Sequence, residues 1–153
     1  MEQGATLFRQ GFFFFAGRAV AHARDILNIW SEEAIANALF GYGEERYARR
    51  IAKKIIERRK IKKIETAFDL VNVVKSAVPV AYARGRLHPA TKTFQALRIA
   101  TNDELGVLKK GLRAAWKRLA KNGRIAVISF HSIEDRLIKR FFAELCRHQV
   151  STG

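Results

Sequence analysis

The chain has 153 residues, 48% of them hydrophobic and 28% charged, which is typical of a globular protein and excludes a disordered one. Its 29 lysines and arginines against 14 acidic residues give a formal net charge of +15, which favours polyanionic partners, RNA or DNA before an anionic membrane. The single cysteine excludes an internal disulfide framework, disfavours a cysteine-ligated zinc site and fits a reducing cytoplasm.

Residues 1–23 form an atypical leader. The apolar run of residues 11–17 is too short to span a membrane. Ala21-His22-Ala23 is similar to a signal-peptidase site, but the charges of Arg9 and Arg18 disfavour a signal peptide. We therefore expect no membrane partner.

From Arg24 to about residue 60 the sequence predicts three helices. The first spans residues 25–30, and Ser31 is the expected N-cap of the second. Gly41-Tyr42-Gly43 is expected to end the second helix. The third runs from residue 44 to about 60, and its apolar stripe consists of Tyr47, Ala48, Ile51, Ala52, Ile55 and Ile56.

Basic side chains occupy the other faces of this third helix, and the basic run continues through Lys62 and Lys63. This pattern favours a surface that contacts RNA phosphates. The residues expected to make these contacts are Arg46, Arg49, Arg50 and Lys53. A solvated helix face without a nucleic-acid partner is the alternative interpretation.

Three further helices are predicted up to residue 119. The capping box of residues 66–69 opens the first, and Pro79 ends it. Residues 80–87 are expected to form a basic loop. His88-Pro89 opens the second helix, and Asn102 is the expected cap of the third. The residues expected to face inward are Phe68, Val71, Val74, Val78, Phe94, Leu97, Thr101, Leu105, Leu108, Leu112, Ala115 and Leu119.

Residues Ile125 to Phe130 form a short, apolar, β-branched run that predicts a strand buried on both faces. Ser132, with Asp135 three residues later, predicts the N-cap of a following helix. A strand, a turn and a helix make one unit of a parallel α/β sheet, in which ligands bind beyond the carboxyl ends of the strands, here at His131. The sequence contains no second convincing strand, so we expect the rest of the sheet to be absent from this chain.

The histidines and the carboxylates near the predicted strand can each be interpreted as functional or as structural residues. His131 is either a functional residue at the ligand-bearing end of the strand or a histidine bonded to local backbone, and a capping role alone would explain His88. Glu134 and Asp135, in the first turn of a helix, are expected to cap it rather than act as general acids or bases. No glycine-rich loop follows a strand, and no group of residues predicts a metal site.

Four segments, in sequence order, closely resemble motifs of the bacterial small-subunit ribosomal RNA methyltransferase H family. They are YGEERYARRIA at 42–52, HPATKTFQALRI at 88–99, NDEL at 102–105 and ISFHSIEDR at 128–136, and the resemblance extends from Ala23 to about Cys146. It implies methylation of N4 of a cytidine in the 16S rRNA of the small ribosomal subunit, with S-adenosylmethionine as the cofactor. It also implies an α/β fold, a Rossmann-like methyltransferase with an all-helical insertion, of which this chain would be mostly α-helical with one buried strand.

By the same resemblance, residues 24–87 correspond to the helical insertion domain and residues 88–153 to the C-terminal part of the methyltransferase domain. The family's glycine-rich cofactor turn lies upstream of all four motifs, so we expect no cofactor-binding residue here and a fragment that is inactive alone. The substrate-side candidates carried over from the motifs are His88, Thr91, Arg98, Asn102, Ser129 and His131. The competing interpretations are a non-catalytic, basic RNA-binding helical module, which salt-dependent RNA binding without cofactor binding would favour, and a chain without function.

Overall fold

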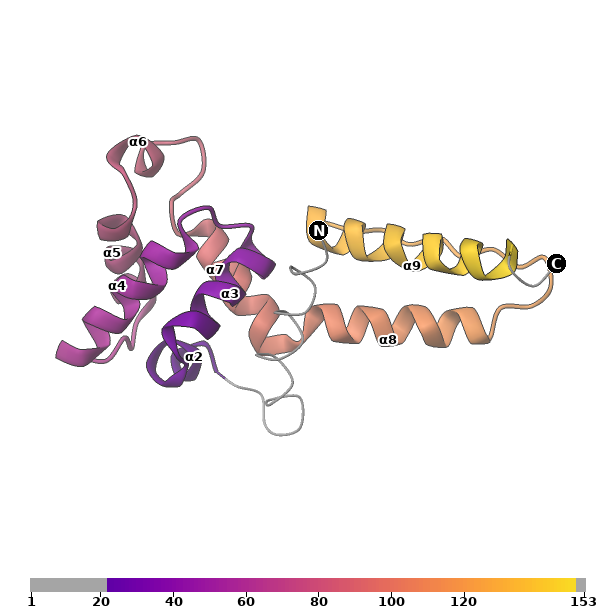
Figure 1. The fold of residues 1–153 in the computed structure, drawn as a ribbon, viewed down its shortest axis with the longest axis horizontal. Coiled ribbons are helices and arrows are strands. Elements are labelled where there is room, and N and C mark those ends of the chain that lie inside the picture. Colours follow the sequence, from indigo (N-terminus) through magenta and orange to yellow (C-terminus); the bar gives the residue numbers. More distant parts are fainter. Residues whose placement is uncertain (1–21, 151–153) are drawn as a thin grey trace. The chain divides into compact units, whose positions relative to one another are not determined.

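A computed structural model describes residues 22–150, with side chains up to Arg147 (Figure 1). The described residues are mostly helical, as predicted. Residues 1–21 of the predicted leader lie outside this description. The helices are α2 (Ala23–Ile29), α3 (Glu32–Gly43), α4 (Ala48–Ile61), α5 (Ala67–Ala77), α6 (Val80–Ala83), α7 (Thr91–Asn102), α8 (Glu104–Lys117) and α9 (Ser132–Val150).

The chain divides into two compact units, one ending at Asn102 and one beginning at Asp103. Within the described residues, the first unit contains α2 to α7 and the second contains α8 and α9. The predicted domain limits, residues 24–87 and 88–153, refer to the domains of the family and stay a prediction. No helix among residues 22–150 is both long and apolar enough to cross a membrane.

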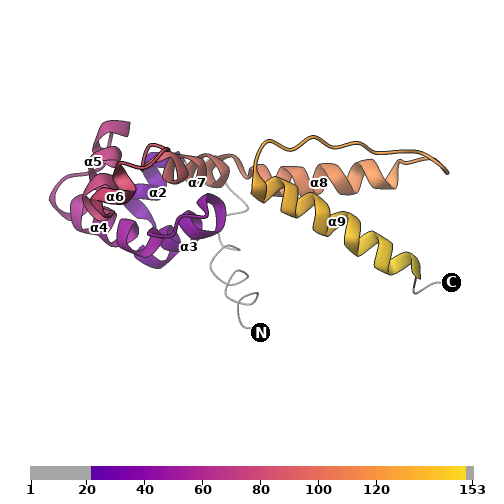
Figure 2. The same cartoon turned by 90° about the horizontal axis from the view of Figure 1, so that it is seen from above.

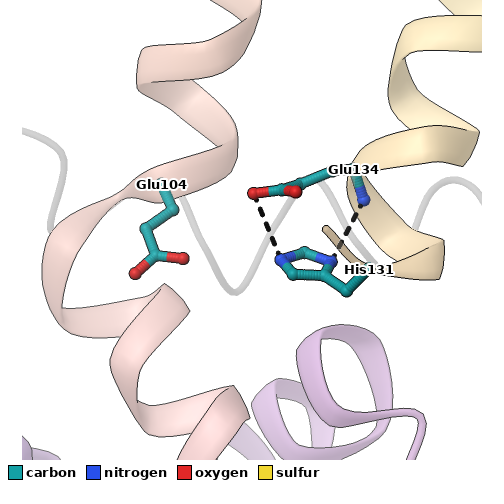
Figure 3. Close-up of side chains that lie close together, drawn as sticks. All are labelled: Glu104, His131 and Glu134. Atoms are coloured by element: carbon teal, nitrogen blue, oxygen red, sulfur yellow. Dashed lines mark hydrogen bonds and ion pairs between the residues drawn. The ribbon is translucent and has the colours of Figure 1, made fainter. Parts of the chain in front are cut away.

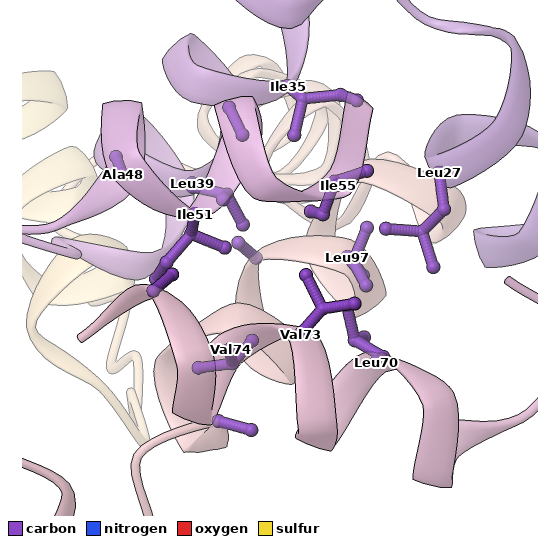
Figure 4. Close-up of a cluster of buried hydrophobic side chains, with 14 of the residues drawn as sticks. Leu27, Ile35, Leu39, Ala48, Ile51, Ile55, Leu70, Val73, Val74 and Leu97 are labelled. Atoms are coloured by element: carbon purple, nitrogen blue, oxygen red, sulfur yellow. The ribbon is translucent and has the colours of Figure 1, made fainter. Parts of the chain in front are cut away.

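The first unit is built around α3, which packs against both α4 and α7, while α4 also packs against α2 and α5. Apolar residues recurring every three or four positions on each helix meet in one core, which Figure 4 shows. Its larger members are Ile26, Leu27, Ile35, Leu39, Ile51, Ile55, Ile64, Leu70, Val73, Val74, Val78 and Leu97.

Side-chain caps fix the starts of two helices in this unit, and both were predicted. Ser31 Oγ accepts a hydrogen bond from the backbone amide of Ala34 at 3.2 Å. Thr66 Oγ1 accepts one from the amide of Asp69 at 3.1 Å, and Asp69 Oδ2 accepts one from the amide of Thr66 at 3.1 Å. The hydrogen bonds from Thr66 lower the pKa of the Asp69 carboxyl.

Several predicted helix limits in the first unit are wrong. Helix α3 continues through Gly41-Tyr42-Gly43 and is capped by Glu44, which adopts a left-handed conformation with φ of 49°. The next helix therefore starts at Ala48 instead of residue 44. Phe68 was expected in the core but is 76% exposed. The predicted loop after Pro79 contains the short helix α6.

In the second unit, α8 and α9 pack against each other and run in the same direction, so the segment between them returns along the unit (Figure 2). The expected N-cap of α8, Asn102, is instead the last residue of α7, and Asp103 occupies the capping position with φ of 47°. Of the five residues expected to face inward along this helix, only Leu112 is buried.

The predicted buried strand at Ile125–Phe130 is wrong for this structure. These residues form no regular element, and no strand occurs among residues 22–150. Ile128 is 83% exposed and Phe130 is 92% exposed. The physical reason is pairing: a strand needs a neighbour to take its backbone hydrogen bonds, and the described part of the chain offers none. The Rossmann-like sheet is thus implied only by the family.

Candidate functional site

The start of α9 brings together a histidine and a glutamate from the fourth motif. His131 Nδ1 accepts a hydrogen bond from the backbone amide of Glu134 at 3.3 Å, and its Nε2 lies 3.3 Å from Glu134 Oε1 (Figure 3). The other carboxylate oxygen of Glu134 accepts a hydrogen bond from the amide of Phe130 at 3.0 Å. The side chains of His131 and Glu134 are 15% and 22% exposed.

His131 is therefore the N-cap of α9, a position that was predicted for Ser132. The carbonyl of His131 accepts the first helical hydrogen bond, from the amide of Asp135 at 3.1 Å, and its ring accepts another from Glu134. Because a neutral imidazole carries one N–H, the accepting Nδ1 requires the proton to be on Nε2. Nε2 lies 3.3 Å from Glu134 Oε1 but forms no hydrogen bond with it, so among the described residues this buried nitrogen has no hydrogen-bond partner.

Glu104, the first residue of α8, completes the cluster. One ligand atom from each of Glu104, His131 and Glu134 lies within 4.8 Å of the others, and all three residues are half-buried. The sequence predicted neither glutamate as a site residue, because a first-turn glutamate is explained by helix capping alone. A cation at this position would need Nε2 to give up its proton while Nδ1 still accepts from the backbone, which a neutral imidazole cannot do.

This arrangement suits a ligand that donates hydrogen bonds. The carboxylates of Glu104 and Glu134 are acceptors, and the oriented Nε2–H of His131 is a donor beside them. An amino group next to a ring nitrogen, as in cytosine, offers two donors and one acceptor. The carboxylate acceptors of the cluster match the amino group of cytosine, and its Nε2–H donor matches the ring nitrogen.

The other predicted substrate-side residues are distributed over both units. Thr91, Arg98 and Asn102 are exposed and, at spacings of seven and four residues, lie on one face of α7. His88 precedes α7, and its Nδ1 accepts a hydrogen bond from the amide of Ala90 at 3.3 Å. The remaining candidate of the second unit is Ser129, which is half-buried in the segment before α9.

The predicted phosphate-contacting residues lie on α4 and directly before it. Arg46, Arg49, Arg50 and Lys53 are all exposed. By contrast, Arg59 further along the same helix donates hydrogen bonds to the carbonyl oxygens of Leu27 and Trp30 at 3.2 and 2.7 Å, and so has a structural role.

Comparison with known proteins confirms the resemblance seen in the motifs. The MraW methylase family matches residues 16–153. Proteins named ribosomal RNA small subunit methyltransferase H are similar to this chain: that of Lactobacillus johnsonii is 47% identical over 131 residues, covering 86% of this chain and 42% of the relative. The relative from Treponema denticola is 50% identical over 123 residues, covering 80% and 39%. The relative from Heliobacterium modesticaldum is 52% identical over 125 residues, covering 82% and 40%.

The chain thus spans about two fifths of the length of the curated relatives it matches, with shares of 42%, 39% and 40%. The family match over residues 16–153 includes residues of both compact units and all four motifs. The chain belongs to the MraW methylase family.

Proposed function

We propose that this chain forms the substrate-side part of an S-adenosylmethionine-dependent methyltransferase that acts on N4 of a cytidine in 16S rRNA of the small ribosomal subunit. The single observation that carries the proposal is the cluster of Glu104, His131 and Glu134, because it brings the third and fourth motifs together within one unit. The relatives are named as methyltransferases of small-subunit ribosomal RNA. An rRNA substrate would place the activity in the cytoplasm.

The described residues do not fit the cofactor. A cradle for S-adenosylmethionine in this fold class would be a glycine-rich turn between a strand and a helix. Residues 22–150 contain no strand, and none of their glycines has a positive φ. We therefore propose no cofactor contact for residues 22–150, and the role proposed for them is to bind and orient the RNA.

In this proposal the target cytosine leaves its base stack, because the reacting amino group is inaccessible within a helix. The carboxylates of Glu104 and Glu134 accept hydrogen bonds from the N4 amino group and so fix the direction of its nitrogen. His131 helps to keep Glu134 in place because its Nδ1 accepts a hydrogen bond from the Glu134 backbone amide. The other proposed substrate-side residues, from their place in the motifs, remain His88, Thr91, Arg98, Asn102 and Ser129.

A chimera tests this function. The segment of the Treponema denticola relative that aligns with this chain is replaced by the chain's own residues, and methylation of small-subunit rRNA is measured. We expect an active chimera, in which His131→Asn lowers the methylation rate by about a hundredfold, since misplacement of a reacting group by 1 Å can cost that much. Asparagine still caps a helix well, so this variant separates the two roles of His131.

Two outcomes would contradict the proposal. A chimera that folds and binds rRNA but transfers no methyl group would show that this chain lacks the substrate-side residues. A His131→Asn chimera with an unchanged rate would remove the cluster from the mechanism. In the second case the matched variant Glu104→Gln would decide whether the carboxylates act without the histidine.

A second candidate function, the non-catalytic RNA-binding module, is favoured by one observation. Among the described residues, Arg49 and Lys53 on α4 are exposed and make no ion pair or hydrogen bond through their side chains. RNA binding by the chain together with an inactive chimera would support this function over methyl transfer.

A further inference from the structure

A fully buried carboxylate lies at the turn before α4. Glu45 is 0% exposed, its Oε1 accepts a hydrogen bond from the backbone amide of Tyr47 at 2.9 Å, and its Oε2 accepts one from the Tyr82 hydroxyl at 2.8 Å. A buried carboxylate is normally paired with a cation, and Arg46 is the next residue in the chain. Here both carboxylate oxygens bind tyrosine groups instead, so Glu45 fixes Tyr47 and Tyr82 and leaves the arginine without a carboxylate partner.

The Tyr47 ring is in turn a platform for two arginines. The ring of Tyr82 packs against it edge-on, with centroids 4.9 Å apart and an interplanar angle of 76°. The guanidinium carbons of Arg46 and Arg50 lie 5.1 and 5.8 Å from the Tyr47 centroid, within range of cation–π attraction. The ring therefore holds two positive groups near each other, in side chains that are otherwise long and mobile.

Two like charges held together repel each other unless an anion lies between them. Among the described residues, neither Arg46 nor Arg50 forms an ion pair with a carboxylate. Guanidinium groups bind phosphate oxygens through paired N–H donors, and cation–π contacts leave those donors available at the edge of the group. An oxyanion with several acceptor oxygens fits this pair better than a monodentate anion.

We propose that Arg46 and Arg50 form a binding site for an RNA phosphodiester, and that Tyr47, fixed by Glu45 and Tyr82, is the positioning residue for both arginines. Arg49 and Lys53 extend the same basic surface along α4, as a repeating chain of phosphates would need. The inference rests on RNA being the partner in the proposed function. It does not depend on methyl transfer.

The test measures binding of a labelled single-stranded RNA by the 153-residue chain, without cofactor, at several KCl concentrations. Arg46→Gln/Arg50→Gln removes both charges. The control Lys109→Ala/Lys110→Ala removes two exposed charges from α8, so the net charge falls equally. We expect the first pair to reduce the slope of log K against log salt by about 0.7 for each phosphate that the variant no longer neutralises, and the control to change the slope much less.

Variants of the ring separate positioning from folding. Tyr47→Leu removes the platform but keeps both arginines, and we expect it to reduce affinity and slope in the same direction as the arginine pair. Tyr47→Phe keeps the ring and should restore wild-type binding. Circular dichroism and thermal unfolding identify any variant that loses its fold, and the arginine variants retain the ring and so test the site independently.

Three results would overturn the inference: equal effects of the arginine pair and the α8 control, unchanged RNA binding by a folded Tyr47→Leu variant, or binding of anionic lipid vesicles without binding of RNA. Because the assay contains no methyl donor, these failures are distinct from an inactive chimera. If the chimera fails to methylate but the salt dependence of RNA binding still requires Arg46 and Arg50, the phosphate site is supported and only the proposed methyl transfer is contradicted.

Discussion

His131 Nδ1 accepts a hydrogen bond from the backbone amide of Glu134, while His131 Nε2 faces the carboxylate of the same residue at 3.3 Å. One glutamate thus contacts both ring nitrogens, and the imidazole cannot rotate without breaking the interaction at each. The first turn of α9 and the orientation of the candidate site therefore depend on the same side chain.

Replacing His131 should loosen the first turn of α9 in a way that depends on the new residue. His131→Ala removes the capping acceptor and should cost about 1 kcal/mol, whereas His131→Asn should retain most of it. Hydrogen exchange of the Glu134 amide measures this directly, and the alanine variant should exchange about fivefold faster than the asparagine variant. Equal exchange in both variants would show that the ring does not cap the helix.

The Tyr82–Glu45 contact should be visible in alkaline titration. Burial first, and then the hydrogen bond and charge of Glu45, raise the pKa of Tyr82 from 10.0 to about 12. The folded chain thus holds the hydroxyl proton where the unfolded chain has released it. The stabilisation is complete below pH 10 and disappears as the pH rises to about 12.

Ultraviolet titration of the wild type and Tyr82→Phe isolates this group, since the chain has three tyrosines. The difference between the two curves should contain one tyrosine titrating near pH 12. Glu45→Gln should move that titration back toward the ordinary value. A difference curve centred near 10 would contradict the contact.

The sequence was sufficient for two helix starts in the first unit because the signals of a side-chain cap are local. Ser31 and the Thr66–Asp69 box cap helices as predicted, since a cap is defined within four residues. The end of α3 was mispredicted because Gly41 and Gly43 suggest a break, while close packing of Gly43 against α7 requires a residue without a side chain. Packing between distant segments is not visible in a local pattern.

The candidate site followed from the sequence only in part. His131 was identified, but Glu104 and Glu134 were not, because their position in a first turn has a sufficient explanation in helix capping. The predicted strand at Ile125–Phe130 was wrong because it was inferred from composition alone. Its composition is that of a strand, but pairing is supplied by a neighbour and not by composition.

Gly43 should be intolerant of any side chain. A Cβ there would lie 2.5 Å from the carbonyl oxygen of Lys92 and 3.2 Å from Cβ of Ala96, both on α7. Gly43→Ala should therefore force α3 and α7 apart and lower the free energy of unfolding by about 1–3 kcal/mol, measured by urea denaturation.

Gly111, within α8, provides the matched control because an added Cβ there meets no atom within 4 Å. Gly111→Ala should stabilise its helix by up to about 1 kcal/mol, since alanine has the higher helix propensity. If both substitutions stabilise the chain, the close approach of α3 to α7 at Gly43 is incorrect.

Asn28 ties the end of α2 to the segment after α4, and its side-chain amide should be irreplaceable. Its Nδ2 donates to the carbonyl oxygen of Ile64 at 2.8 Å, and its Oδ1 accepts from the amide of Ile64 at 3.0 Å. Ile64 is 1% exposed, so its backbone groups have little access to water when the side chain of Asn28 is removed. Asn28→Ala should therefore lower the free energy of unfolding by about 2–3 kcal/mol, because a buried unsatisfied polar group costs about 1–3 kcal/mol. Asn28→Asp keeps the acceptor without the donor, so its free energy of unfolding in urea should lie between those of the wild type and the alanine variant. Equal stability of the alanine and aspartate variants would show that only the Nδ2 donor matters.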